Sequence, residues 1–376
     1  MNRLRNEGFN AHLLEKEKLG QGQTICSQGM IHGGIKYSLS GMLTSASSAI
    51  ADMPGYWKAC IAGDGDIDLR DCNLLSEQYY MWPKNNIRSR LNAFLGSKTL
   101  EGRVTKVEPG EYPDFFKYNI PGPLYKLQDI VLDVPSLLSC LSSKQHEYIH
   151  KIDWTDNSII MSDDGNISGI RINNETIVTA KKYILCAGKG AGTLLKQCAV
   201  HNIDMQLRPL QMVYVKHNIQ FPLYVHCVSD QLSMTPELTI TTHTDKDKNS
   251  VWYLGGELAE AGANMEKEQL ILHTRKKLSE LFPWCDFSQA EFNSFHIDRA
   301  EEKQPGKKRP DTESLINQGN LMVSWPTKLT LAPNLANTIV QTLKQEITAT
   351  KADSQNSDLS FLPSPEVAVP PWEQQP

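Results

Sequence analysis

The first fifteen residues constrain the fold more than any other feature, because they have the order of the second half of a βαβ unit. Residues Asn2 to Asn10 predict the end of a helix that stops at Gly8, and the apolar segment Ala11 to Leu14 predicts a strand closed by Glu15. The first strand of such a unit and its glycine-rich turn would precede Met1. We therefore expect an α/β protein built on a Rossmann-like sheet that is N-terminally incomplete.

Glu15 has the position of a nucleotide-binding residue. In dinucleotide-binding βαβ units an acidic residue closes the second strand, about 20 residues after the first glycine of G-x-G-x-x-G, and hydrogen-bonds a ribose. Counting back from Glu15 runs past Met1, so the sequence lacks this fingerprint. A solvated strand end is the alternative interpretation of Glu15.

Length and composition favour a protein that acts on small molecules. A chain of 376 residues is long enough for one large α/β domain with a second, interleaved domain. The formal net charge of -5, with no long basic run, gives no reason to expect nucleic acid as a partner.

The eight cysteines include no C-x-x-C pair, so we expect neither a disulfide framework nor a metal site. The spacing of Asp64, Asp66 and Asp68 is similar to a calcium loop, but Leu69 and Leu75 stand where Gly and Glu are required.

The cellular location follows from two further observations. No segment approaches the roughly 18 apolar residues of a membrane-spanning helix, and the polar start of the chain does not predict a signal peptide. We expect a cytoplasmic, reduced protein, and peripheral contact with the inner face of a membrane stays open as an alternative.

The remaining pattern predicts alternating helices and strands. Helices are expected over residues 37–60, 133–142 and 266–281, the second of them entered through Pro135. Residues 159–179 predict two antiparallel hairpins, and residues 183–186 and 321–324 predict strands. The last strand leads through a turn into a helix that ends near residue 347. Residues 350–376 are rich in Ser, Pro and Gln and predict a disordered tail.

Three motifs then resemble segments of FAD-dependent oxidoreductases of the D-amino acid oxidase and glycerol-3-phosphate dehydrogenase family. They are CSQGMIHGGIKY from Cys26, YILCAGKGAG from Tyr183 and GNLMVSWPTKLTLAP from Gly319. The resemblance implies a discontinuous Rossmann-like FAD-binding domain (residues 1–70, 133–205 and 305–349) and an inserted α+β substrate domain (residues 71–132 and 206–304). Taken without the others, each motif is also compatible with an ordinary loop, turn or amphipathic helix.

The first motif resembles the family's flavin-contacting loop, which implies cofactor contacts from Ser27, Gly29, His32, Gly33 and Gly34. Glycines let the backbone approach a flat ring, and a hydroxyl can reach phosphate or ribityl oxygens. A histidine beside the ring can polarise it, position substrate or exchange a proton. A structural histidine bonded to backbone is the alternative for His32.

The other two motifs and the first strand complete the implied cofactor contacts. Ala187 and Gly188 resemble the turn beside the adenosine and pyrophosphate, where small residues permit close packing. The G-x-G-x-G spacing that starts at Gly188 is not the missing fingerprint.

The resemblance places the turn before the C-terminal helix under the flavin, where a helix N-terminus stabilises negative charge on the ring. Trp325-Pro326 departs from the family, in which a Gly pair is usual. The implied residues of this group are Glu15, Lys16, Ala187, Gly188, Thr327, Lys328, Leu329 and Thr330.

Two arginines are candidates for substrate binding. Arg309 resembles the position from which relatives send an arginine toward a substrate carboxylate or phosphate, a role that suits its planar fork. Arg299, in HIDR, is the second candidate. A solvated basic loop for Arg309 and a salt bridge for Arg299 are the alternatives.

The resemblance implies a reaction and leaves one other hypothesis open. The reaction is hydride removal from a C–H bond beside a hydroxyl or amine, with electrons passed from FAD to oxygen, quinone or another acceptor. The small-molecule substrate would be a hydroxy acid, glycerol 3-phosphate or an amino acid. The other hypothesis is a truncated member that binds flavin poorly and has no activity, because the pyrophosphate normally rests on the fingerprint and the following helix N-terminus.

Overall fold

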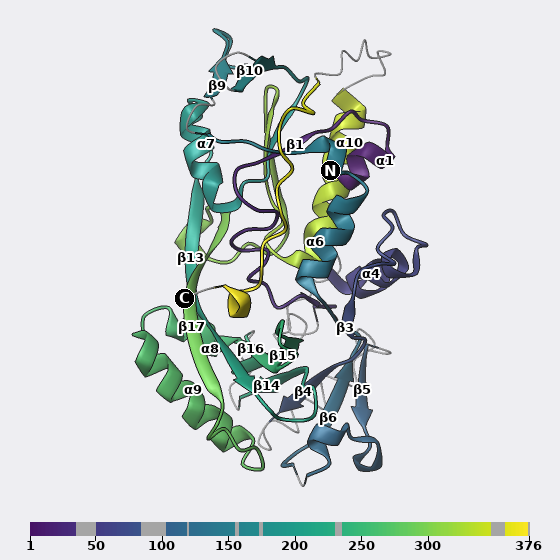
Figure 1. The fold of residues 1–376 in the computed structure, drawn as a ribbon, viewed down its shortest axis with the longest axis vertical. Helices are drawn as coiled ribbons and strands as arrows, with labels where there is room; N and C mark the ends of the chain where they lie inside the picture. Colours follow the sequence, from purple (N-terminus) through teal and green to yellow (C-terminus); the bar gives the residue numbers. More distant parts are fainter. Residues whose placement is uncertain are drawn as a thin grey trace.

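The computed structural model describes residues 1–34, 50–83, 103–118, 120–154, 158–172, 176–229, 235–346 and 358–374. Within these ranges the structure is the mixed α/β fold that the sequence predicts, with short parallel strand pairs and helices at one end and a large sheet at the other (Figure 1). Residues 35–37 of the first motif and the first part of the helix expected over residues 37–60 lie outside the described residues.

Parallel strand pairs form the end of the molecule that carries Glu15. Strand β1 (Leu13–Glu15) pairs with β8 (Ile149–Lys151), and β12 (Tyr183–Leu185) pairs with β19 (Leu321–Trp325). Strand β18 (Ser314–Gln318) adds to β19 in antiparallel orientation. Parallel pairing requires crossover connections, which the chain supplies through long excursions between these strands. The expected strand before Glu15 is confirmed.

Helices cover this layer. The short helix α1 (Asn2–Asn6) lies against α10 (Ala332–Glu346), and Arg3 donates to the Asn337 side chain over 3.2 Å. Helix α6 (Val134–Ser143) begins where expected, because the Asp133 carboxylate accepts the Ser136 N–H and Pro135 occupies the first turn. Helix α7 (Ala191–Gln197) follows the turn after β12. The expected hairpins are β9 (Ser158–Met161), β10 (Ile167–Ile172) and β11 (Thr176–Val178).

The large sheet has eight strands in the order β17-β13-β16-β15-β14-β4-β6-β5. Their bounds are β4 Tyr79–Pro83, β5 Val104–Val107, β6 Leu124–Leu127, β13 Met205–His217, β14 Val225–Val228, β15 Leu238–Thr244, β16 Ser250–Gly255 and β17 Glu291–Glu302. Helix α8 (Glu257–Gly262) follows β16, and α9 (Lys267–Leu281) packs on one face through Leu270 and Leu278, over a core that includes Trp252. The opposite face includes Thr239 and Thr241 beside Tyr253 and Met212.

Two long strands link the two ends of the molecule. Strands β13 and β17 pair over twelve residues, from Met205 opposite Glu302 to Lys216 opposite Glu291. Figure 1 shows them running along one side of the molecule from the large sheet toward α7. At their far end, Ala300 and Met205 pack in one cluster with Tyr183 and Leu321. Side chains on this ribbon therefore reach the boundary between the parallel strands and the large sheet.

A three-stranded sheet carries the end of the glycine-rich loop. Strand β2 (Met30–Ile31) pairs with β7 (Ile130–Leu132), which also pairs with β3 (Leu74–Ser76). Helix α4 (Met53–Ala62) packs beside it through Trp57 and Met53. His32 follows β2 directly, so this sheet fixes the position of His32 relative to α4.

The C-terminal segment corrects an expectation. The prediction of a disordered tail is wrong for residues 358–374, which we call the C-terminal strap: Leu359, Leu362, Ala368 and Trp372 are buried. Figure 1 shows the strap running down the middle of the molecule. Composition failed as a guide because an extended Pro-rich segment stays ordered when other segments supply partners for its backbone and its few apolar side chains.

Buried histidines in the large sheet predict acid sensitivity. Burial lowers the pKa of His243 from its ordinary 6.5 to about 3 and that of His217 to about 4. The unfolded chain therefore binds more protons below pH 6.5, so stability is full above that pH and falls as the pH drops toward 4, by ~1.4 kcal/mol per pH unit for each histidine. We expect His243→Gln to flatten this dependence in urea unfolding, whereas the exposed His201→Gln leaves it unchanged. Equal slopes in both variants would contradict the prediction.

Candidate functional site

His32 and Thr330 meet although 298 residues separate them. The backbone N–H of His32 donates to Thr330 Oγ1 over 3.2 Å, and the Trp57 indole N–H donates to the Thr330 carbonyl oxygen over 3.2 Å. His32 and Thr330 are both buried. The first and third sequence motifs, assigned to one site only by resemblance, are therefore adjacent in the structure.

The glycine-rich loop, residues 19–29, is fastened to the large sheet. The Gln28 amide donates to the Tyr253 carbonyl oxygen over 2.8 Å, and the Tyr253 hydroxyl donates to the Cys26 carbonyl oxygen over 2.6 Å. On the other side the Ala300 N–H donates to the Gln23 side chain over 3.0 Å. Beyond the loop, the Gly33 N–H donates to Asp129 over 2.8 Å. The loop thus joins β16, β17 and the sheet that carries His32.

Gly29 and Ser27 give this loop the properties of a ligand-binding segment. Gly29 has φ +68°, and a Cβ atom there would lie 2.0 Å from the Leu132 carbonyl oxygen, so only glycine lets the loop approach β7 this closely. The buried Ser27 hydroxyl has no hydrogen-bond partner among the described residues. A buried polar atom without a partner calls for an explanation, and a bound polar ligand supplies one. The loop therefore suits a cofactor that approaches its backbone.

The turn between β19 and α10 holds a strained residue. Thr327 has φ +58°, a left-handed conformation that β-branched residues rarely adopt. Its hydroxyl donates to the Thr312 carbonyl oxygen over 3.1 Å. Lys328 follows, with its ammonium group donating to the Asp311 carbonyl oxygen over 2.9 Å, and the helical turn η8 (Leu329–Leu331) leads directly into α10. Strain of this kind concentrates at binding sites.

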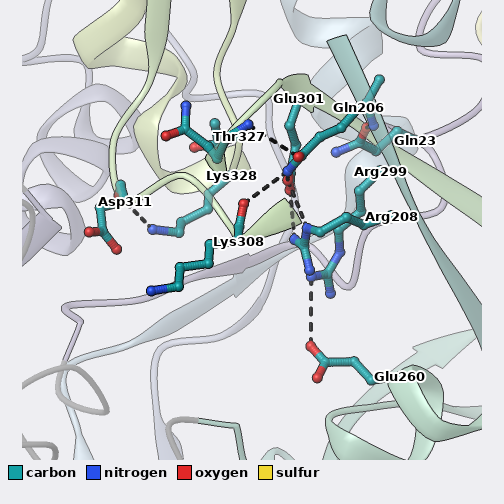
Figure 2. Close-up of polar contacts among 12 residues, drawn as sticks. Gln23, Gln206, Arg208, Glu260, Arg299, Glu301, Lys308, Asp311, Thr327 and Lys328 are labelled. Atoms are coloured by element: carbon teal, nitrogen blue, oxygen red, sulfur yellow. Dashed lines mark hydrogen bonds and ion pairs between the residues drawn. The ribbon is translucent and has the colours of Figure 1, made fainter. Parts of the chain in front are cut away.

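Four cationic side chains gather beside this turn: Arg208, Arg299, Arg309 and Lys328. Figure 2 shows Arg208 and Arg299 side by side, between Glu301 and Glu260, with Lys328 nearby. Arg299 has a loose ion pair of 3.9 Å with Glu260, and its buried Nη1 has no hydrogen-bond partner among the described residues. The same holds for Arg309 Nε within the described part of the chain. These two guanidinium groups can therefore still donate hydrogen bonds to a bound anion.

Arg208 is paired with a buried carboxylate. It donates through Nε and Nη2 to both oxygens of Glu301, over 2.7 and 2.6 Å, and Glu301 is completely buried. In the register of β13 and β17, Arg208 stands directly opposite Arg299. Like charges in that position repel. Glu301 lies two residues after Arg299 on β17, and its negative charge counteracts this repulsion. Arg299 is thereby left available to bind an anion.

The charges of the cluster change its titration. Burial, followed by the charges of Arg309 and Arg208, lowers the pKa of Arg299 to about 10, so this group stays positive at neutral pH. Burial, followed by the charge of Arg309, lowers the pKa of Lys328 to about 7. Perturbed groups of this kind are typical of functional sites. A bound anion would favour the charged form of Lys328.

The remaining predicted residues lie at the C-terminal ends of parallel strands. Glu15 ends β1, and its carboxylate accepts hydrogen bonds from the N–H groups of Lys16 and Glu17. These local bonds agree in part with the alternative interpretation of Glu15 as a solvated strand end. Lys16 is exposed. Ala187 and Gly188 follow β12, and the next residue, Lys189, pairs with Asp298 of β17 over 2.5 Å. In open α/β sheets ligands bind outside the carboxyl ends of such strands.

Sequence reasoning missed four contributors: Arg208, Glu301, Asp129 and the C-terminal strap. Arg208 and Glu301 are 93 residues apart, and only the register of β13 and β17 brings them together. The sequence marked Arg299 only as a charged residue on a strand, and that description fits the neighbouring charged residues of the same strand equally well.

Among the described residues no group of His, Cys, Asp or Glu could hold a metal ion, and none of the helices described is long and apolar enough to cross a bilayer.

Comparison with known proteins shows a strong similarity to a bacterial oxidoreductase. The chain is 38% identical over 373 residues to a probable FAD-dependent oxidoreductase of Pseudomonas aeruginosa, an alignment that covers 99% of this chain and 93% of that protein. The crystal structure of the FAD-dependent oxidoreductase from that organism matches with a TM-score of 0.83 and 34% identity, over 99% of this chain and 93% of the other. No family model matches the chain.

More distant structures share the fold. Glycine oxidase from Geobacillus kaustophilus matches with a TM-score of 0.63 and 14% identity, over 93% of this chain and 91% of the other. The dithionite-reduced L-α-glycerophosphate oxidase of Mycoplasma pneumoniae, solved with FAD bound, matches with a TM-score of 0.63 and 16% identity, over 88% of each chain. These similarities establish the architecture, a Rossmann-like FAD domain with a substrate domain.

Proposed function

The chain belongs to the FAD-dependent oxidoreductases, and from this membership we propose that it uses FAD to oxidise a small anionic substrate at a C–H bond beside a hydroxyl or an amine. The single observation that carries the proposal is the contact between His32 and Thr330, which joins the two motifs assigned to the flavin ring. Lys328 precedes Thr330 by two residues, and together with Arg299 and Arg309 it would supply the anion site.

The residues present fit FAD. The orphaned Ser27 hydroxyl and the side-chain-free backbone at Gly29 suit a flat, polar ligand. We assign the flavin ring to Ser27, Gly29, His32, Gly33 and Gly34 together with Thr327, Lys328, Leu329 and Thr330. Glu15, Lys16, Ala187 and Gly188, at the ends of β1 and β12, would hold the adenosine end. We propose the domain division expected from the sequence, and the origin of the eight strands of the large sheet, residues 79–127 and 205–302, supports it.

The chain's own residues then have separate tasks. FAD, when bound, accepts the hydride and passes electrons to an acceptor. Arg299 and Arg309 would bind the carboxylate or phosphate through charge-assisted hydrogen bonds and so orient the C–H bond. His32 is held by its backbone bond to Thr330 and would polarise the ring or take up the substrate proton. The start of η8 and α10, with Lys328, would stabilise negative charge on the reduced ring.

The names of distant relatives agree with an anionic substrate. Glycine oxidase and L-α-glycerophosphate oxidase are named for compounds with a carboxylate or a phosphate. We propose the same class here: an amino acid, a hydroxy acid or glycerol 3-phosphate. The cation cluster supports this choice, because buried guanidinium groups without full neutralisation favour a bound anion.

Anaerobic reduction of the flavin tests the function. Purified protein would be mixed with FAD and exposed to amino acids, 2-hydroxy acids and glycerol 3-phosphate, while the visible band of oxidised flavin is followed. We expect stoichiometric flavin, bleaching by at least one anionic compound, and a KM raised at least about tenfold in Arg309→Gln, since charged hydrogen bonds contribute roughly 1.5–3 kcal/mol. The neighbouring, exposed Lys308→Gln is the matched control. A protein that takes up no flavin would favour the inactive alternative.

Lys328 predicts the pH dependence of substrate binding. Because its pKa is lowered to about 7, Lys328 is charged below that pH and neutral above it. We expect kcat/KM for an anionic substrate to fall as the pH rises through about 7. Arg309→Gln removes a charge that lowers this pKa, so the fall should move to higher pH, whereas Lys328→Met should abolish it. A profile that Lys328→Met leaves unchanged would contradict the assignment.

A further inference from the structure

We propose that the C-terminal strap, residues 358–374, is a positioning element of the flavin site: it holds the glycine-rich loop, residues 19–29, in the conformation that binds the cofactor. The inference rests on the proposed function, because it assumes that this loop contacts FAD. The strap runs down the middle of the molecule (Figure 1). Its first part contacts β8 and the cluster around Ile152, its middle contacts the loop, and its end contacts Tyr253.

The first part of the strap is anchored beside β1 and β8. Leu359 and Leu362 are buried in one cluster with Ile152 and Ile172. The Lys151 N–H donates to the Pro363 carbonyl oxygen over 2.7 Å, which ties the strap to the end of β8. This anchor fixes the strap at the end of the parallel strands from which the glycine-rich loop departs.

The middle of the strap pairs with the first residue of the loop. The Leu19 N–H donates to the Glu366 carbonyl oxygen over 2.8 Å, and the Ala368 N–H donates to the Leu19 carbonyl oxygen over 3.0 Å. Leu19 and Val367 form a parallel bridge, as in a short β ladder. Ala368 is buried with Ile25 of the loop. The strap therefore supplies both backbone and apolar partners to the loop.

The end of the strap supports the residue that fastens the loop to the large sheet. Trp372 is buried, with its ring 5.4 Å from the Tyr253 ring and 4.7 Å from the His243 ring. Tyr253 donates to the Cys26 carbonyl oxygen and accepts from Gln28. Trp372 thus acts on the loop through Tyr253, beside Ser27 and Gly29.

The loop needs such support because it has no strand or helix of its own between β1 and β2. Its glycines at positions 20, 22 and 29 adopt positive φ, and glycine-rich backbone loses much conformational entropy on ordering. A segment that is already ordered before the ligand arrives binds it more tightly. The prolines of the strap restrict its own backbone to extended conformations, which reduces the cost of keeping it in place.

The test uses full-length variants and FAD as the probe. Trp372→Ala removes the support of Tyr253, Trp372→Phe keeps an aromatic ring, and Val369→Ala changes an exposed residue of the same strap. The dissociation constant for FAD would be measured by quenching of flavin fluorescence at a temperature well below unfolding of each apoprotein. We expect Trp372→Ala to weaken FAD at least about tenfold, equivalent to ~1.4 kcal/mol. Trp372→Phe should stay within about threefold and Val369→Ala should equal the unaltered chain.

A deletion with rescue adds an independent arm. A chain that lacks residues 358–376 should lose FAD affinity and the resolved visible spectrum of bound flavin, and a synthetic peptide of residues 358–374 added in excess should restore both. The proposal is overturned if Trp372→Ala lowers apoprotein stability but binds FAD as tightly as the unaltered chain, because the strap would then serve stability alone. If the unaltered chain itself binds no FAD, the proposed function fails first, and the two failures are thereby distinguished.

Discussion

Gly29→Ala is expected to abolish FAD binding and to lower the free energy of unfolding by about 3–5 kcal/mol. The new Cβ atom would lie 2.0 Å from the Leu132 carbonyl oxygen, at a residue whose φ of +68° already disfavours a side chain. Leu132 cannot retreat cheaply, since its N–H donates to the Gly29 carbonyl oxygen over 2.9 Å. Loop and strand β7 must separate, which displaces Ser27 and His32 together. Urea unfolding and FAD fluorescence would measure the two effects.

Gly22→Ala is the matched control for this variant. Gly22 belongs to the same loop and has φ +84°, but nothing lies within 4 Å of a Cβ atom built there. It therefore reports backbone strain without the clash, and we expect a loss of only ~1 kcal/mol with FAD binding retained. Equal losses in the two variants would show that the close approach of Gly29 to β7 has no special role.

Glu301→Gln is expected to lower the free energy of unfolding by about 3–5 kcal/mol. The carboxylate is completely buried and binds Arg208 through two hydrogen bonds. Without that charge, Arg208 loses its buried carboxylate partner while it faces Arg299 across the β13–β17 ladder. We expect lower stability in urea unfolding and, where the variant folds, an altered KM for an anionic substrate.

An exposed ion pair just beyond the ends of β13 and β17 provides the comparison. Lys303 and Asp204 are paired over 2.7 Å, but their side chains are 60% and 65% exposed. Asp204→Asn should therefore cost less than about 1 kcal/mol. If Glu301→Gln proved as mild as Asp204→Asn, burial of the Arg208–Glu301 pair would not have the importance assigned to it.

Local patterns predicted the parts of the fold that depend on neighbouring residues. Helix α6 was marked by Pro135 in its first turn, and α9 was marked by the helical spacing of its apolar residues. The end of β1 at Glu15 followed from an apolar run closed by a charge. These signals lie within one turn or one strand, where hydrogen bonding and side-chain periodicity determine the structure.

Features that depend on distant partners could not be predicted this way. Glu301 and Arg208 meet only because twelve residues of β13 and β17 are in register. The strap has the composition of a disordered tail, yet Leu19, Lys151 and Tyr253 supply its partners from elsewhere in the sequence. The family resemblance implied that His32 and Thr330 contact the same cofactor. The hydrogen bond between them shows that the two residues are adjacent, and the cofactor contact stays a prediction.

The most direct test is an experimentally determined structure of the chain with FAD bound. The account predicts that the isoalloxazine ring contacts both residues 29–33 and residues 328–330, with Arg299 and Arg309 facing the same side of the ring and the adenosine near Glu15 and Gly188. A flavin found elsewhere, with His32 and Lys328 sharing no ligand, would contradict it.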